Sequence, residues 1–167
     1  MRREILTWDD VNKLVDALRP QFRGGFDAML MITRGGIIPG GLIAEALDIR
    51  YILTAAVRFP ATELPIPKLA ALPEFLQFPD DHLIDGRRTL VMDDVWGSGR
   101  TITAVKDRVM AAGGRPDTCV FHFNPYRSLF TKAEPNYYGA ITDAHIVYPW
   151  EIDRGVDPIL ARQPMIG

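Results

Sequence analysis

The chain has 167 residues, a composition typical of soluble globular proteins and a formal net charge of −2. This length suits a single domain over residues 1–167, large enough to bury roughly 70% of its unfolded surface. The slightly acidic balance argues against a broad basic surface for nucleic acid. Any phosphate that the protein binds must therefore be met by local basic groups.

Cysteine usage and hydropathy indicate a cytoplasmic protein. Cys119 is the only cysteine, which excludes an internal disulfide and fits a reducing compartment. It lies in an apolar run, so we expect a buried, inert thiol. The first residues lack the apolar core of a signal peptide, and no apolar run approaches the ~20 residues that span a bilayer, so we expect no membrane partner.

The first third of the chain predicts a helix and then a strand–loop–helix unit. Thr7 and Asp10 form a capping pattern before a helix over residues 8–19, which Pro20 ends. Residues 28–33 are an apolar run typical of a buried strand, and residues 49–57 predict another. Between them lie Arg34-Gly35-Gly36 and a helix that we expect to open at Pro39. Its inner face is expected to carry Leu42, Ile43, Ala46 and Leu47.

Residues 58–82 hold five prolines and no sustained hydrophobic period. A stretch of this kind is uncommon in a compact domain and is usually a functional lid or a disordered segment. A fixed structural insert is an equal alternative, in which residues 69–78 form a short docked helix.

The central stretch, residues 89–105, combines a strand, two acids and a glycine-rich loop. Residues 89–92 form an apolar run that we expect to end at Asp93 and Asp94, and residues 97–101 form a tight loop before a helix that reaches about residue 112. In open α/β sheets ligands bind at this position, and backbone N–H groups at a helix start suit an anion. The structural alternative is a tight turn with a helix cap at Ser98.

Two common phosphate-binding patterns do not fit this loop. A dinucleotide fingerprint requires glycine where Ile102 stands, and the phosphate loop of nucleotide hydrolases requires lysine where Arg100 stands. Further along, residues 117–123 predict a strand, and the segment to residue 139 reads as irregular. Residues 144–151 close the core, and residues 152–167 read as a tail.

The stretch Val91-Met92-Asp93-Asp94-Val95-Trp96-Gly97-Ser98-Gly99-Arg100-Thr101 resembles the phosphoribosyl-pyrophosphate (PRPP) motif of the type I phosphoribosyltransferases. Residues 31–44 resemble the pyrophosphate loop and following helix of the bacterial xanthine–guanine members. Residues 147–151, Val-Tyr-Pro-Trp-Glu, resemble the ending of the same purine-salvage family. The resemblance implies an α/β fold with a mostly parallel central sheet, flanking helices and a small base-binding hood at about residues 124–151. The segment at about 58–82 stands at the place of the family's mobile loop.

The implied reaction is transfer of a 5-phosphoribosyl group from PRPP to a purine or purine-like base, with Mg²⁺ and release of pyrophosphate. Arg34, Asp93 and Asp94 are the implied catalytic residues: Arg34 grips pyrophosphate, the acids hold the ribose hydroxyls, and Asp94 also faces the metal. The implied PRPP- and phosphate-binding residues are Gly35, Gly36, Val95, Trp96, Gly97, Ser98, Gly99, Arg100 and Thr101. The implied base-binding residues are Asn124, Arg127, His145 and Ile146.

Three positions depart from the family pattern, all in the base half of the site. The resemblance implies an aspartate where Gly97 stands, a lysine where Asn124 stands and a stacking aromatic where His145 stands. The alternative hypothesis is therefore a catalytically weak protein of this fold that binds PRPP or a nucleotide as a sensor. A third class, a sugar-phosphate isomerase, leaves the Arg34 loop and the Trp150-Glu151 ending unexplained. Relatives usually pair, so we expect a homodimer or homotetramer.

Overall fold

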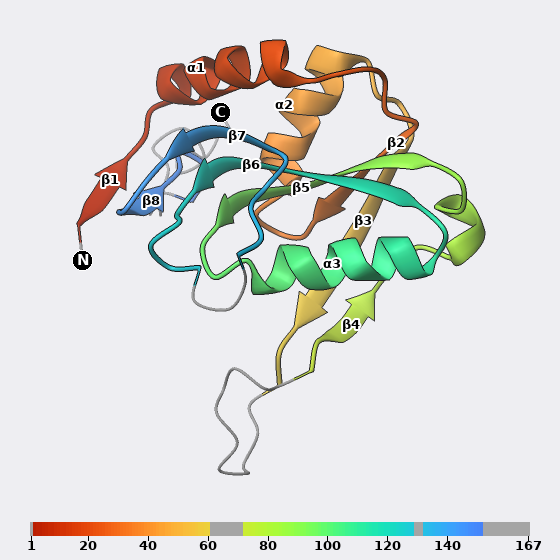
Figure 1. Cartoon of the computed structure of the whole chain (residues 1–167). Coiled ribbons are helices and arrows are strands. Elements are labelled where there is room, and N and C mark those ends of the chain that lie inside the picture. Colours follow the sequence, from red (N-terminus) through yellow and green to blue (C-terminus); the bar gives the residue numbers. More distant parts are fainter. Residues whose placement is uncertain (1, 61–71, 129–131, 152–167) are drawn as a thin grey trace, which may run out of the picture.

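A computed structural model describes residues 2–60, 72–128 and 132–151. A six-stranded sheet runs through its centre in the order β4-β3-β2-β5-β6-β7 (Figure 1). The strands are β4 Glu74–Gln77, β3 Ile52–Arg58, β2 Ala28–Ile32, β5 Arg88–Trp96, β6 Arg115–Phe123 and β7 Tyr137–Ile141. All neighbouring pairs are parallel except β3 and β4. The predicted mostly parallel sheet is confirmed.

Helices cover both faces of this sheet, as the sequence predicts. Helices α1 (Trp8–Leu18) and α2 (Ile37–Leu47) lie on one face, and α3 (Arg100–Ala111) lies on the other (Figure 1). The chain leaves β2 through α2 toward β3 on one side, and leaves β5 through α3 toward β6 on the other. The connections therefore diverge between β2 and β5, which is where an open α/β sheet binds ligands.

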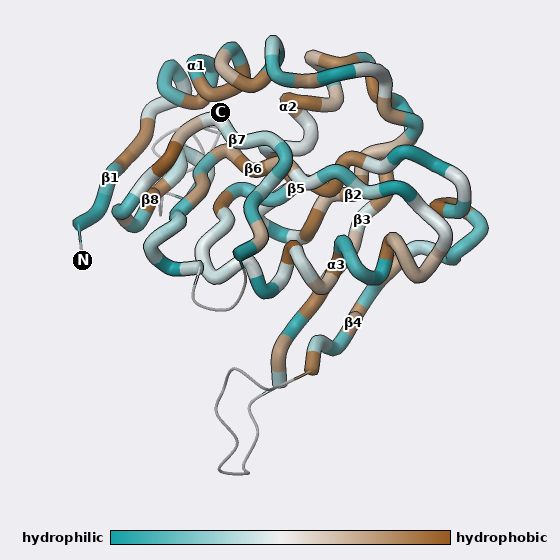
Figure 2. Tube along the Cα trace, in the orientation of Figure 1, coloured by the Kyte–Doolittle hydropathy of each residue, from teal (hydrophilic) through white to brown (hydrophobic). Residues whose placement is uncertain are grey.

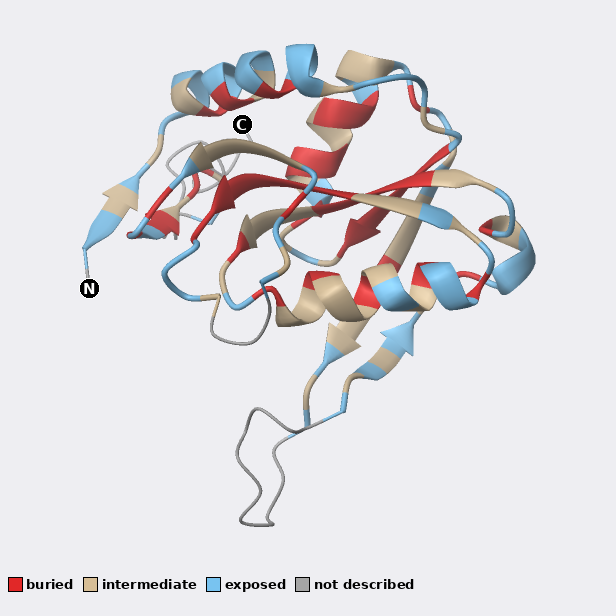
Figure 3. Ribbon diagram, viewed as in Figure 1, coloured by how far each residue is buried: buried red, intermediate tan, exposed pale blue. Residues whose placement is uncertain are grey.

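The core consists of two apolar layers, one on each side of the sheet. All of β2 is buried, and apolar residues line the middle of β5 and β6 (Figures 2 and 3). Leu90 and Met92 of β5 pack in the layer under α1 and α2, whereas Val91 packs in the layer under α3. This alternation is what a strand covered on both faces requires, because successive side chains point to opposite sides.

The predicted helices are confirmed with small shifts. Thr7 caps α1, its hydroxyl accepting from the Asp10 N–H while the Asp10 carboxylate accepts from the Thr7 N–H. Helix α2 begins at Ile37 rather than at Pro39, which leaves the proline in the first turn, where its missing N–H is not needed. Its most buried residues are Pro39, Gly40, Ile43 and Ala44, so the expected inner face is only partly correct.

Several strand predictions need correction. Residues 74–77, expected as loop or short helix, form β4 and pair with β3. Residues 69–71 of the suggested helix lie outside the described residues. Tyr137 begins β7 rather than ending an irregular segment. The strand at His145–Val147, β8, pairs with β1 (Arg3–Ile5) in a separate two-stranded sheet, because this segment leaves the main sheet after β7.

Two further expectations meet the described residues only in part. Residues 61–71 of the expected lid and the expected tail, 152–167, lie outside them.

Cys119 is buried on β6, as expected, and burial raises the pKa of its thiol. None of the described helices combines the length and the apolar character needed for a membrane crossing.

Candidate active site

The turn after β2 touches the end of β5 at the point where the connections diverge. A Cβ atom added to Gly36 would lie 2.2 Å from the Met92 carbonyl oxygen, and one added to Gly35 would lie 2.7 Å from the Asp94 carboxyl carbon. The Thr33–Arg34 peptide preceding these glycines is cis. The Arg34-Gly35-Gly36 loop and the acidic strand therefore form one surface, and only glycine permits so close an approach.

The acid pair lies inside β5, not at its end as the sequence suggests. β5 continues to Trp96 and stays paired with β6, but its pairing with β2 stops at Met92. The Asp93 carboxylate accepts from the Asp94 N–H at 2.9 Å, and the Asp94 carboxylate accepts from the Val95 N–H at 2.7 Å. Both acids thus lie past the last β2–β5 pair, and the Asp94 carboxylate lies against Gly35 of the Arg34 loop.

Burial raises the pKa of both acids. For Asp93 the removal from water acts first and the nearby Asp94 charge adds to it, so its pKa stands well above the ordinary value. For Asp94 burial again raises the pKa, the Val95 N–H opposes it, and the Glu151 charge adds to it. Two neighbouring carboxyls of raised pKa are typical of sites where a ligand or cation completes the electrostatics.

The loop after β5 leads into α3 without a side-chain cap. Gly99 is the residue before the helix, at φ 77°, and a Cβ there would lie 2.2 Å from Nε1 of the Trp96 indole. Ser98 is exposed, and its hydroxyl accepts from the Arg100 N–H at 3.4 Å, so the expected cap at Ser98 is at most a weak one. The helix start thus presents uncapped N–H groups, an arrangement that suits an anion.

The nine predicted PRPP- and phosphate-binding residues lie in two segments, residues 35–36 and 95–101, and they differ in which atoms they expose. Trp96 is buried in the layer under α3, so only its backbone can face a ligand. Arg100 lies with its guanidinium 3.8 Å from the centre of the Phe59 ring, at the root of the 58–82 segment. The Gly97 Cα meets open space, since a Cβ there would contact nothing within 4 Å.

A hollow of about 840 Å³ opens beside the acids. The described residues that line it are Arg34, Gly35, Ile37, Ile38, Asp93, Asp94, Trp150 and Glu151. Arg34 is exposed, and among the described residues its guanidinium has no hydrogen-bond or ion-pair partner. Of the described residues, Arg34 and the acidic side chains of Asp93, Asp94 and Glu151 thus line a space the size of a small-molecule site.

Trp150 and Glu151 reach the hollow from a tight turn. The Glu151 N–H donates to the Tyr148 carbonyl at 3.0 Å, and the Tyr148 N–H donates to the Glu151 carboxylate at 2.9 Å. The Trp150 ring stacks on Tyr148 at 4.5 Å between ring centres and 5° between planes. The sequence places Trp150 and Glu151 in the expected base-binding hood but does not single them out as site residues; the Pro149 turn directly before them was the available signal.

The four expected base-binding residues are not among the described residues lining the hollow. Asn124 is buried, and its side-chain oxygen accepts from the Tyr126 N–H, which closes the turn after β6. Arg127 follows in the same turn and is exposed. His145 is exposed on β8 and Ile146 is buried beside it, paired with β1.

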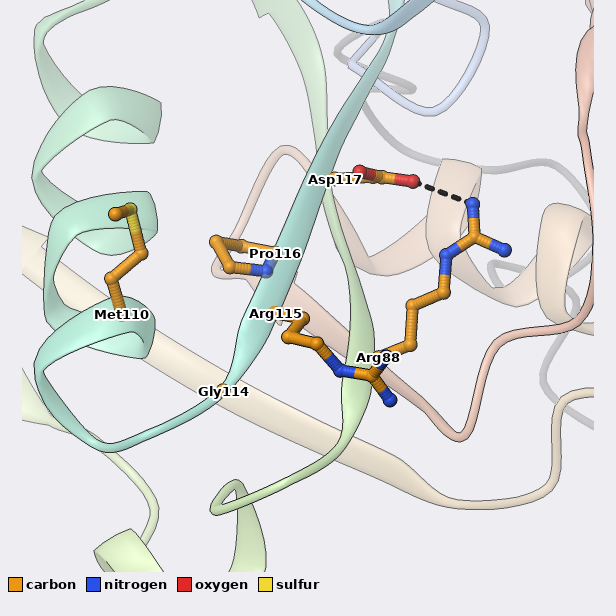
Figure 4. A pocket seen from close by; sticks show the side chains of 6 residues that line it. All are labelled: Arg88, Met110, Gly114, Arg115, Pro116 and Asp117. Carbon is orange, nitrogen blue, oxygen red and sulfur yellow. Dashed lines mark hydrogen bonds and ion pairs between the residues drawn. The ribbon is translucent and has the colours of Figure 1, made fainter.

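A second hollow, of about 380 Å³, lies at the other end of the strands and carries two arginines (Figure 4). Arg88 there is already bonded: it pairs with Asp117 at 2.8 Å, donates to the carbonyls of Arg23 and Gly25, and covers the Phe26 ring. Arg115 donates to the Gly86 carbonyl. Two arginines make this hollow the alternative place for an anion, but the Arg88 guanidinium already bonds to protein partners.

The described residues contain no group of three or more His, Cys, Asp or Glu side chains placed to hold a metal ion by themselves. Asp93 and Asp94 offer oxygen atoms, the ligands that Mg²⁺ prefers, but too few to enclose it. Such a pair fits a cation that keeps its water ligands and also binds the oxygens of a substrate.

No protein-family model matches the chain. It resembles xanthine-guanine phosphoribosyltransferase of Ruegeria sp. strain TM1040, at 29% identity over 161 residues that span 88% of this chain and 84% of the relative. Among solved structures, purine phosphoribosyltransferase from Pyrococcus horikoshii superposes with a TM-score of 0.74 at 26% identity, over 91% of this chain and 96% of that one. A hypothetical protein from Neisseria gonorrhoeae with bound ppGpp superposes with a TM-score of 0.78 at 22% identity, over 90% of each chain.

Proposed function

We propose that this chain is a type I phosphoribosyltransferase and that it transfers a 5-phosphoribosyl group from PRPP to a purine base, as its likeness to the xanthine-guanine and purine phosphoribosyltransferases suggests. The products would be a nucleoside monophosphate and pyrophosphate, as in purine salvage. The observation that carries the proposal is the contact between the Arg34 loop and Asp94 at the divergence of β2 and β5. It brings a free guanidinium, loop amides and paired carboxylates to one hollow.

Each part of PRPP has a chemically matched partner in this proposal. The pyrophosphate lies on Arg34 and the backbone of Gly35 and Gly36, where a guanidinium fork suits phosphate oxygens. The ribose 2′- and 3′-hydroxyls donate to Asp93 and Asp94, whose carboxylate oxygens are acceptors. The 5′-phosphate lies at the uncapped start of α3, with the N–H groups of residues 97–101 and the hydroxyls of Ser98 and Thr101.

We further propose Mg²⁺ as the cofactor, held by Asp94 together with substrate oxygens. Three acidic side chains and one arginine are the charged groups among the described residues that line the hollow, and this acidic lining fits a cation accompanying the diphosphate. When bound, Mg²⁺ would neutralise charge on the departing pyrophosphate. The chain's own contribution is to orient PRPP and to offset charge as the bond from ribose to pyrophosphate breaks.

The proposed base half of the site lacks polar groups that the family resemblance implies. Gly97 supplies no carboxylate to accept a proton from the base, and a positioned acceptor is typically worth ~10²–10⁴ in rate. Asn124 is committed to its own turn. Trp150 and Ile37 instead give the hollow an apolar wall, and a planar base could lie against it.

Pyrophosphate release from Mg²⁺·PRPP across guanine, xanthine, hypoxanthine, adenine and no base tests the proposal. We expect base-dependent release with at least one purine and none without a base. Asp94→Asn should lower kcat/KM for PRPP by roughly tenfold or more, because a charged acceptor of a ribose hydroxyl is lost. Tight PRPP binding with no release for any base would refute the enzyme and leave the second candidate.

The second candidate is a protein that binds PRPP or a nucleotide as a sensor without useful turnover. The open space at Gly97 and the burial of Asn124 favour it, since both remove polar groups expected to act on the base. Calorimetric titration measures the affinity of the protein for PRPP, GMP and ppGpp. The last of these is bound in the structure of the gonococcal neighbour. Submicromolar binding of a nucleotide together with absent pyrophosphate release would establish this role.

By the same family likeness we propose a homodimer or homotetramer that works in the cytoplasm. Light scattering coupled to gel filtration measures the oligomeric state. A purely monomeric protein at micromolar concentration would contradict it.

A further inference from the structure

Tyr148 is a fully buried tyrosine whose hydroxyl joins three elements at the site. Its ring has no exposed surface, and its hydroxyl donates to the Asp94 carbonyl of β5 at 3.1 Å. The same hydroxyl lies 2.7 Å from Nδ1 of His122 on β6. Because a tyrosine hydroxyl has one proton, donation to Asp94 means that His122 Nδ1 carries the proton of the second bond.

Asp94 needs such support because of its place in the sheet. Pairing between β2 and β5 stops at Met92, two residues earlier. Beyond that point the strand borders the Arg34 loop, which contacts the Asp94 carboxylate through Gly35. The Tyr148 hydroxyl therefore bonds the backbone of the very residue whose carboxylate must be fixed.

Tyr148 also carries one wall of the hollow. Trp150 stacks flat on its ring, and Glu151 accepts from its N–H. His122, which secures the hydroxyl, is 5% exposed, and burial lowers the pKa of its imidazole to about 4. A neutral imidazole gives a fixed donor at Nδ1 throughout the physiological range.

We propose that Tyr148 is a positioning residue that fixes Asp94 for PRPP through its hydroxyl, and that His122 acts behind it by holding that hydroxyl. This inference rests on the proposed function for its consequence in PRPP binding. The geometry of the His122–Tyr148–Asp94 chain is independent of which base is used.

Tyr148→Phe removes the hydroxyl and keeps the ring under Trp150. We expect the Kd and KM for Mg²⁺·PRPP to rise about tenfold, as for a lost buried hydrogen bond next to a binding group, and the KM for the base to change less than about twofold. Tyr137→Phe is the matched control. It removes the partly buried hydroxyl of Tyr137, which donates to Asp117 near the other end of the sheet, and should leave all three constants unchanged.

His122 variants separate positioning from packing. His122→Leu should weaken PRPP binding about threefold, whereas His122→Asn, which keeps a donor near the Nδ1 position, should stay within about twofold of the wild type. In the double variant of Tyr148→Phe and His122→Leu the losses should not add, because both act through one hydroxyl.

Hydrogen exchange of the Val95 amide provides a readout without any substrate. This N–H donates to the Asp94 carboxylate, so it should exchange faster in Tyr148→Phe and at the wild-type rate in Tyr137→Phe. If the wild type fails to bind Mg²⁺·PRPP, the proposed function falls while this exchange still decides the role of Tyr148. Unchanged exchange and affinity in Tyr148→Phe, additive losses in the double variant, or equal defects in both His122 variants would overturn the proposal.

Discussion

Replacing Gly36 with alanine tests whether the Arg34 loop must lie against β5. The added Cβ would be 2.2 Å from the Met92 carbonyl oxygen and 2.8 Å from the Ile32 carbonyl oxygen, whereas ordinary contacts begin near 3.4 Å. Both obstacles are backbone atoms of buried strands, so the loop itself must move, by about 1 Å. A displacement of that size at a substrate-positioning element can lower activity by about 10²-fold.

The assay is initial-rate pyrophosphate release with PRPP varied at a fixed base concentration, together with urea unfolding of each variant. For Gly36→Ala we expect kcat/KM for PRPP to fall about 10²-fold and the free energy of unfolding to fall by about 1–3 kcal/mol, as for an overpacked site. Gly41→Ala is the matched control in α2, since its Cβ would meet nothing within 4 Å. It should keep full activity and gain about 0.5–1 kcal/mol, because alanine is the better helix former.

Gly35→Ala separates loss of activity from loss of stability. Its Cβ would lie 2.7–2.8 Å from the Asp94 carboxyl atoms, which are side-chain atoms that can turn away. We therefore expect a stable protein with an Asp94 displaced from its PRPP-binding position and a higher KM for PRPP. Wild-type kinetics in Gly36→Ala, or an equal loss of activity in Gly41→Ala, would refute the placement of the loop.

Three further changes probe other parts of the site. Asp93→Asn should cut kcat/KM for PRPP about tenfold or more yet raise the free energy of unfolding at neutral pH, measured in urea. The stability gain is expected because the pKa of Asp93 is raised, which means that the folded state binds the proton more tightly than the unfolded state. The free energy of unfolding of the wild type therefore falls as the pH rises above the ordinary carboxyl pKa near 4, and Asp93→Asn should lack that fall. A side chain at position 97 would enter open space, so the Gly97→Asp variant should fold normally, and its kcat with 6-oxopurines should rise about 10²-fold. An unchanged kcat would show that the missing proton acceptor does not limit the rate. Trp150→Ala should raise the KM for the base about tenfold, while Trp8→Ala, which loses only a tilted contact at 5.9 Å, should not; equal effects would contradict the stacking wall.

The proposed sugar-phosphate half of the site could be predicted from the sequence because its signals are local. Asp93, Asp94 and the glycine loop stand within nine residues, and Arg34-Gly35-Gly36 follows an apolar strand directly. Parallel strands bring their carboxyl ends to one edge, so the meeting of these two turns could be predicted.

The proposed base half of the site could not be predicted in the same way, because the position of its residues depends on pairing between strands that are far apart in the sequence. β8 leaves the main sheet to pair with β1, a three-residue strand with no hydrophobic alternation to reveal it. Asn124 is buried by a bond within its own turn, and Trp150 and Glu151 reach the hollow through a turn closed on Tyr148. The short strand β4 was missed for a related reason: its pairing with β3 is bounded by prolines.

The most direct test is a crystal structure with Mg²⁺ and a non-reactive carbocyclic PRPP analogue. We expect the ribose hydroxyls within hydrogen-bond distance of the Asp93 and Asp94 carboxylates, and the diphosphate on Arg34 and the Gly35–Gly36 backbone. An analogue found instead beside Arg88 and Arg115, in the hollow of Figure 4, with the Asp94 carboxylate facing only water, would contradict it.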